Sequence, residues 1–102
     1  MGQLQIVNAK FEPGDIAMTA GVNTRCTKDL KFNQFVLQSF GRHLKGDWGD
    51  LDDDDKRTND AALKDGFRLM SAYFFNGNEE DKLWIITEWD RSVTTILFPS
   101  EY

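Results

Sequence analysis

The sequence predicts an α+β domain in which two helices pack on a C-terminal three-stranded antiparallel meander, preceded by short N-terminal strands. Its 102 residues are enough for one domain, so we expect residues 1–102 to fold as a single unit. Near the middle of the chain, apolar side chains recur at helical spacing. The last third consists of β-branched and aromatic runs with short polar links, and such links favour antiparallel hairpins.

The first predicted helix covers about residues 29–44. Thr27 or Asp29 can cap its start, and Gly46 can end it. Its apolar face consists of side chains spaced about 3.6 residues apart, with the sole histidine near its end: Phe32, Phe35, Val36, Phe40, His43 and Leu44.

The second predicted helix covers about residues 52–65. Asp50 or Asp52 can cap its start, and Gly66 is suited to the left-handed residue that follows a helix. This segment is polar on most sides, so we expect the helix to lie on the surface.

Three strands are predicted for the meander, over residues 67–75, 82–89 and 92–98, with Pro99 ending the last one. At the N-terminus the pattern is weaker. Leu4 and Ile6 indicate a short strand, Ile16 and Met18 indicate a second one, and we expect residues 21–27 to form a loop.

Composition and charge exclude several classes of protein. The net charge of −5 argues against direct nucleic-acid binding, which needs a basic surface. No apolar run approaches 18 residues, so we expect no membrane span, and no secretory signal is visible at the N-terminus. A single cysteine cannot form an internal disulfide, which fits a reducing cytoplasm.

Most of the negative charge lies in one segment, residues 45–60. It holds seven carboxylates against three basic side chains, so its own charge is −4. We weigh three interpretations: a solvated helix start, a cation site, or a surface that competes with nucleic acid for a basic groove. The third makes these residues candidates for partner binding: Asp47, Asp50, Asp52, Asp53, Asp54 and Asp55.

Catalytic and metal-binding patterns are weak. His43 and Asp47 could act as a general base and its partner, but a hydrogen-bonded, partly buried histidine is the favoured alternative. Its place near a helix C-terminus favours the charged imidazolium. The run after Asp50 fails as a calcium loop, because Lys56 occupies its seventh position. No phosphate-binding glycine motif is present, so we predict no catalytic residue, metal or cofactor.

Two tryptophans are candidates for contact with a partner. Trp48 lies in a loop between two glycines, where it either plugs the core or contacts another protein. Trp89, Asp90 and Arg91 form a predicted hairpin tip, and tryptophan and arginine are frequent in binding hot spots. The alternative for Asp90 and Arg91 is hydrogen bonding within the turn. Open strand edges together with Trp89 also predict a homodimer.

Several motifs carry a resemblance to a known family. They include GDWGDL at 46–51, KLWIITE at 82–88 and DRSVTTILFPSEY at 90–102. Over about residues 14–102 the chain resembles a family of small plasmid-related proteins of bacterial mobile genetic elements and phages, some of which are labelled type I restriction subunits. Trp89 departs from the pattern, because the resembling proteins often have a small residue there.

The resemblance implies a setting in which small acidic proteins often antagonise host defence. We therefore expect a non-catalytic protein-binding factor that inhibits a host defence nuclease, as an anti-CRISPR or anti-restriction protein, through an acidic and partly aromatic surface. The expected partner is a protein such as a nuclease or CRISPR effector. The alternatives are an accessory protein of plasmid maintenance and a small hydrolase or nuclease that uses His43 and Asp47.

Overall fold

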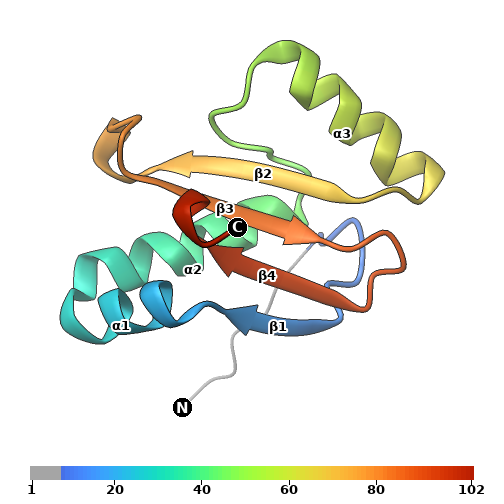
Figure 1. Cartoon of the computed structure of the whole chain (residues 1–102). Helices are drawn as coiled ribbons and strands as arrows, with labels where there is room; N and C mark the ends of the chain where they lie inside the picture. The colour runs from blue at the N-terminus through green and yellow to red at the C-terminus, as the bar shows by residue number, and fades with distance from the viewer. Residues whose placement is uncertain (1–7) are drawn as a thin grey trace.

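The computed structural model describes residues 8–102, and the strand predicted around Leu4 and Ile6 lies outside them. In chain order the described elements are β1 (Asp15–Met18), α1 (Ala20–Lys28), α2 (Leu30–Leu44), α3 (Asp53–Asp65), β2 (Leu69–Phe74), the 3₁₀ turn η1 (Phe75–Gly77), β3 (Lys82–Thr87), β4 (Val93–Leu97) and the 3₁₀ turn η2 (Pro99–Glu101). The fold is α+β, as predicted (Figure 1).

The predicted C-terminal meander is confirmed, since β2 pairs with β3 and β3 with β4 in antiparallel register. The prediction of a three-stranded sheet is wrong. Strand β1 adds to the edge of β4 in parallel register and makes a mixed four-stranded sheet in the order β1-β4-β3-β2. A parallel pair needs a long crossover between its strands, and no local pattern in the sequence indicates one.

Helices α2 and α3 are confirmed with the predicted caps. Asp29 accepts a hydrogen bond from the Phe32 amide at the start of α2, and Asp52 accepts one from the Asp55 amide at the start of α3. Gly66 ends α3 in the left-handed conformation, at φ 78°.

The loop predicted over residues 21–27 is wrong, because this stretch forms helix α1. Its apolar signal is weak, with Val22 its one fully buried residue. Its start is stabilised by a carboxylate about 80 residues away. Glu101 accepts hydrogen bonds from the Thr19 hydroxyl at 2.6 Å and from the Gly21 amide at 2.9 Å. The cap is therefore absent from the local sequence.

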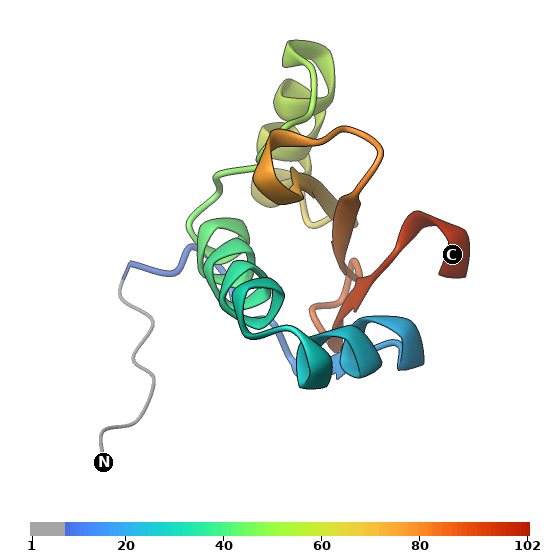
Figure 2. The same ribbon diagram turned by 90° about the vertical axis from the view of Figure 1, so that its left-hand side faces the viewer.

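The sheet has one covered and one open face. Helix α2 lies on the covered face and η2 lies on the opposite side, while α1 lies beyond the end of β1 and runs from the η2 side to the α2 side (Figure 2). The covered face contributes to a core of large apolar side chains: Phe32, Val36, Leu44, Tyr73, Leu83, Ile85 and Ile96. Because side chains alternate along a strand, neighbours such as Met70, Trp84 and Ile86 point to the other side, which we call the open face.

The outer edge of β2 is closed by groups that are not part of a strand. The Asn59 side chain of α3 donates to the Met70 carbonyl at 2.6 Å and accepts from the Met70 amide at 3.1 Å. Asp50 donates its amide to the Ala72 carbonyl at 2.7 Å, and its carboxylate accepts from the Phe74 amide at 2.9 Å. These bonds satisfy backbone groups that an edge strand leaves open to a further strand.

Loss of the Asn59 side chain therefore leaves backbone groups of β2 without partners. We expect Asn59→Ala to lower the free energy of unfolding by about 3 kcal/mol, because two hydrogen bonds to a buried strand are lost. Urea denaturation followed by circular dichroism measures this. The exposed Lys64 on the same helix supplies a control, since Lys64→Ala should stay within about 0.5 kcal/mol of the parent. Equal stability of the two variants would contradict closure by Asn59.

Candidate protein-binding surface

The acidic segment divides into bonded and solvent-facing carboxylates. Asp52 caps α3, and Asp50 is bound to β2 as described above. Asp53, Asp54 and Asp55 form the exposed first turn of α3, where negative charge interacts favourably with the helix dipole. Asp54 also pairs with Arg57. This arrangement is that of a solvated helix start, which leaves three carboxylates facing solvent.

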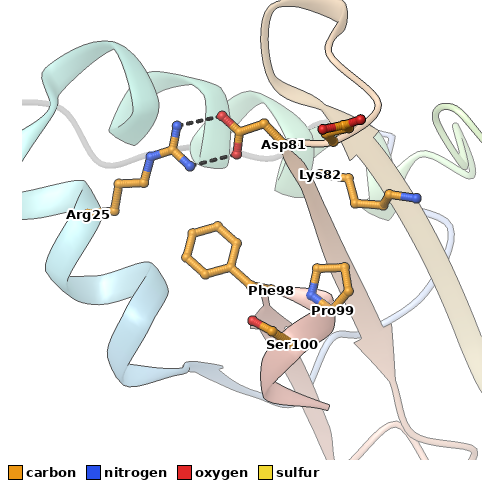
Figure 3. Close-up of a pocket in the computed structure, with 7 residues that line it drawn as sticks. Arg25, Asp81, Lys82, Phe98, Pro99 and Ser100 are labelled. Carbon is orange, nitrogen blue, oxygen red and sulfur yellow. Dashed lines mark hydrogen bonds and ion pairs between the residues drawn. The ribbon is translucent and has the colours of Figure 1, made fainter.

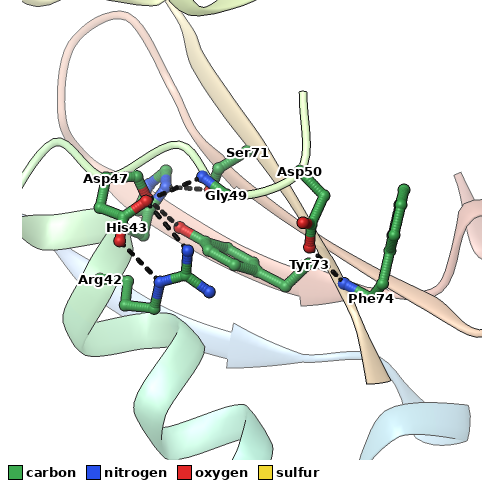
Figure 4. A network of polar contacts seen from close by, with 8 residues as sticks. All are labelled: Arg42, His43, Asp47, Gly49, Asp50, Ser71, Tyr73 and Phe74. Carbon is green, nitrogen blue, oxygen red and sulfur yellow. Dashed lines mark hydrogen bonds and ion pairs between the residues drawn. The ribbon is translucent and has the colours of Figure 1, made fainter. Parts of the chain in front are cut away.

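Asp47 and Trp48 have roles inside the fold (Figure 4 shows the contacts of Asp47). The Asp47 carboxylate accepts from Arg42 Nε at 2.7 Å and from the Gly49 amide at 3.1 Å. The Arg42 hydrogen bond is the main reason that the pKa of Asp47 lies below its usual value. Trp48 is only 3% exposed, and its indole N–H donates to Asp60 at 2.9 Å. Trp48 thus plugs the core and is not part of the surface.

His43 is buried at the centre of a chain of hydroxyl groups. The Thr94 hydroxyl donates its one proton to the Pro13 carbonyl, so it must accept in its hydrogen bond with Thr87. The Thr87 hydroxyl therefore donates its own proton to Thr94 and can only accept from His43. Nε2 of His43 must then donate to Thr87, at 2.9 Å. Because the buried ring is neutral at neutral pH, Nδ1 carries no proton and accepts from Ser71, at 2.5 Å. The hydrogen-bond network assigns the Nε2–H tautomer of a neutral imidazole.

The predicted hydrogen-bonded histidine is therefore confirmed, while the expected positive charge is wrong. Burial, followed by the positive charge of Arg91, lowers the pKa of His43 from 6.5 to about 3. Both ring nitrogens are taken by hydroxyls, and the Asp47 carboxylate is bound to Arg42. The two residues proposed as a catalytic pair thus have separate structural roles.

The pKa of His43 has a consequence for stability. The folded value, about 3, lies below the unfolded value of 6.5, so between these pH values the unfolded chain binds a proton that the folded chain does not. We expect the free energy of unfolding to decrease as pH falls from about 6.5, by at most about 1.4 kcal/mol per pH unit from this residue. The salt-bridged Asp47 and Asp81 affect the free energy of unfolding only at lower pH, because their folded pKa values lie below 3.8.

Two measurements test this expectation. Urea denaturation at a series of pH values above about 4.5 gives the change in the free energy of unfolding per pH unit. Nitrogen NMR of the His43 ring should show an Nε2–H tautomer that does not titrate over the same range. A ring that titrates near its ordinary pKa of 6.5 would contradict the buried neutral state.

The predicted hairpin tip contains one exposed and one structural side chain. Trp89 is 67% exposed. Arg91 instead points into the molecule, where its guanidinium donates to the carbonyls of Phe67 at 2.7 Å, Glu88 at 3.1 Å and Ala62 at 3.4 Å. Asp90 accepts from the Ser92 amide at 3.0 Å within the turn. Arg91 therefore connects the hairpin to the end of α3 and holds exposed Phe67 near the base of Trp89.

The open face carries a second aromatic group, which sequence reasoning missed. Tyr102 is 70% exposed and packs edge-on against Trp84, with ring centroids 5.7 Å apart. Its hydroxyl accepts from Arg68 at 2.9 Å. We call the exposed or half-buried residues of this face the open-face patch: Arg68, Met70, Trp84 and Tyr102. Ile86 and Leu97 lie on the same face but are each only 4% exposed. Alternation in the strand sequences could have indicated a second apolar face, but not whether a helix covers it.

Two shallow pockets join this patch to the acidic helix. One, of about 220 Å³, lies on the open face between Arg68, Ile86, Leu97 and Tyr102. The other, also of about 220 Å³, lies between β2 and α3, where Asp55 and Thr58 line it together with Met70. Arg68 lines both pockets. The open-face patch and the first turns of α3 therefore form one continuous surface.

A larger pocket of about 400 Å³ lies elsewhere, beside η2 and the start of β3 (Figure 3). Arg25 lines this pocket, but both terminal nitrogens of its guanidinium donate to the Asp81 carboxylate, at 2.6 and 2.7 Å. The guanidinium also lies 4.0 Å from the centre of the Phe32 ring. This arginine connects α1 to the β3 end of the sheet, and its charge is already compensated.

Within residues 8–102 no group of three or more His, Cys, Asp or Glu side chains could hold a metal ion. No helix in the same range is long and apolar enough to cross a membrane. Comparisons with protein-family models, curated proteins and solved structures find no match for this chain.

Proposed function

We propose that this chain is a non-catalytic protein-binding domain whose contact surface is the open-face patch together with the acidic start of α3. The observation that carries the proposal is the shared position of Arg68, which lines both the aromatic pocket and the groove beside Asp55. One partner could thus contact the exposed Tyr102 ring, the half-buried Trp84 and the helix carboxylates at the same time.

The chemistry of this surface suits a protein better than a small molecule. Pockets for small molecules usually enclose about 300–1,000 Å³, whereas each pocket here measures about 220 Å³. Tyrosine, tryptophan and arginine are the side chains most enriched at binding hot spots. The patch offers all three, in Tyr102, Trp84 and Arg68, and their mutual contacts hold them in place before binding.

The family resemblance points to the kind of partner. We propose that the protein acts for a bacterial mobile genetic element and inhibits a host defence nuclease, such as a CRISPR effector or a restriction enzyme. Asp53, Asp54 and Asp55 would then occupy part of a basic groove that binds DNA phosphates. Their exposure on the first turn of α3 supports this role, because solvent-facing carboxylates can replace phosphate oxygens opposite lysine and arginine.

The experiment combines capture of the partner with a cleavage assay. Purified protein is added to CRISPR and restriction nucleases from the bacterial host, and binding and DNA cleavage are measured. We expect Tyr102→Ala to weaken binding about tenfold or more, since hot-spot truncations cost more than about 1.4 kcal/mol. The triple change of Asp53, Asp54 and Asp55 to Asn should weaken it further and reduce its dependence on salt.

Leu37 supplies the matched control, because it is an exposed apolar residue on α2, on the other side of the sheet. Leu37→Ala should bind and inhibit like the parent protein. If no host nuclease is bound or inhibited, the proposed partner is wrong. Capture of a plasmid partition or transfer protein by the same patch would instead identify a plasmid-maintenance accessory. The hydrolase alternative gains no support, since His43 has no free ring nitrogen.

A further inference from the structure

We propose that β1 is a homodimerisation edge, through which two copies of this chain pair antiparallel into one eight-stranded sheet. The inference rests on the two edges of the sheet and is independent of the proposed function. In Figure 1, β1 is the outermost strand on the side opposite β2.

The two edges differ in how their backbone groups are satisfied. The β2 edge is closed by Asn59 and Asp50. On β1, the amides of Asp15 and Thr19 donate to Ser92 and Ile96 of the β4 segment, at 2.9 and 3.1 Å. Because a parallel ladder uses every second residue, Ile16 and Met18 direct their N–H and C=O groups away from β4. Within residues 8–102 no strand pairs with this side of β1, so these four groups are available to a further strand.

The side chains of β1 also suit pairing. Ile16 is 54% and Met18 43% exposed, so both present apolar surface to solvent. The strand contains no lysine or proline, which natural edge strands often use to prevent pairing. Ala17 is small and points to the open face, so another strand can approach it closely.

A second copy fits this edge because the strand is complementary to itself. With the two-fold axis at Ala17, Ile16 of each copy lies opposite Met18 of the other. The outward groups then form four hydrogen bonds, and the two Ala17 residues form a non-hydrogen-bonded pair. Asp15 lies opposite Thr19, so no two like charges are opposed. A register centred on Asp15 would place two carboxylates opposite each other and is disfavoured.

This axis is perpendicular to the sheet and has a geometric consequence. A two-fold rotation in that direction keeps each face of the sheet on its own side. The open faces of both copies therefore lie on the same side of the dimer, with the β1 strands at its centre and the two closed β2 edges at its ends.

Disulfide trapping tests the register. In a Cys26→Ser background, Ala17→Cys should form a covalent dimer readily, because Cα atoms of a non-hydrogen-bonded pair are about 4.5 Å apart, within the range of a disulfide. Asp15→Cys is the matched control on the same face of the strand. Its two copies lie about 13 Å apart in the proposed register, too far for a disulfide. Equal cross-linking of the two variants, or none by Ala17→Cys, would overturn the proposal.

Ile16→Pro tests the pairing without cysteine chemistry. This change removes an outward N–H group and leaves the bonds between β1 and β4 in place. Sedimentation from micromolar to submillimolar concentration should show a reversible dimer for the parent and a monomer for the variant. A parent that stays monomeric throughout, or a variant that dimerises equally well, would refute pairing through β1. Circular dichroism confirms that the variant is folded.

Discussion

Closure of the β2 edge is the constraint on which the rest of this structure depends. The segment from Trp48 to Asp50 and the amide of Asn59 bind the backbone of β2 where another strand would otherwise pair. Gly49 makes the approach possible, since at φ 77° a β-carbon there would lie 2.1 Å from the Ala72 carbonyl oxygen. These contacts fix α3 against the sheet, and the same docking buries the Trp48 indole. The groove that joins the aromatic patch to the acidic helix follows from this placement.

The interior satisfies its polar groups internally and thereby leaves recognition to the surface. Among the described residues, every buried side-chain nitrogen or oxygen has a hydrogen-bond partner. His43 is bound by hydroxyls, Arg25 by Asp81 and Arg91 by backbone carbonyls. Groups that resemble catalytic or ion-binding residues in the sequence therefore stabilise the fold. The exposed rings of Tyr102 and Trp89, the solvent-facing carboxylates at the start of α3 and the outward edge of β1 remain accessible to a partner.

Sequence patterns predicted those elements whose determinants are local. Asp29, Asp52 and Gly66 lie beside the helix ends that they define, and the meander is joined by short links. Helix α1 was missed because Glu101, at the other end of the chain, caps it. The pairing of β1 with β4 is equally non-local. At the candidate site, exposure of Trp89 was predicted, but burial of Trp48 and exposure of Tyr102 depend on which elements cover each face, which only the tertiary structure determines.

Native-state hydrogen exchange tests closure of the β2 edge most directly, since it reports on each backbone amide separately. If the edge is closed, the outward amides of Met70, Ala72 and Phe74 should exchange as slowly as amides inside the sheet. In dilute solution, where dimerisation is negligible, the outward amides of Ile16 and Met18 should exchange much faster. Fast exchange at Met70 and Ala72, comparable with that of Ile16, would show that β2 is an open edge and would contradict the arrangement described above.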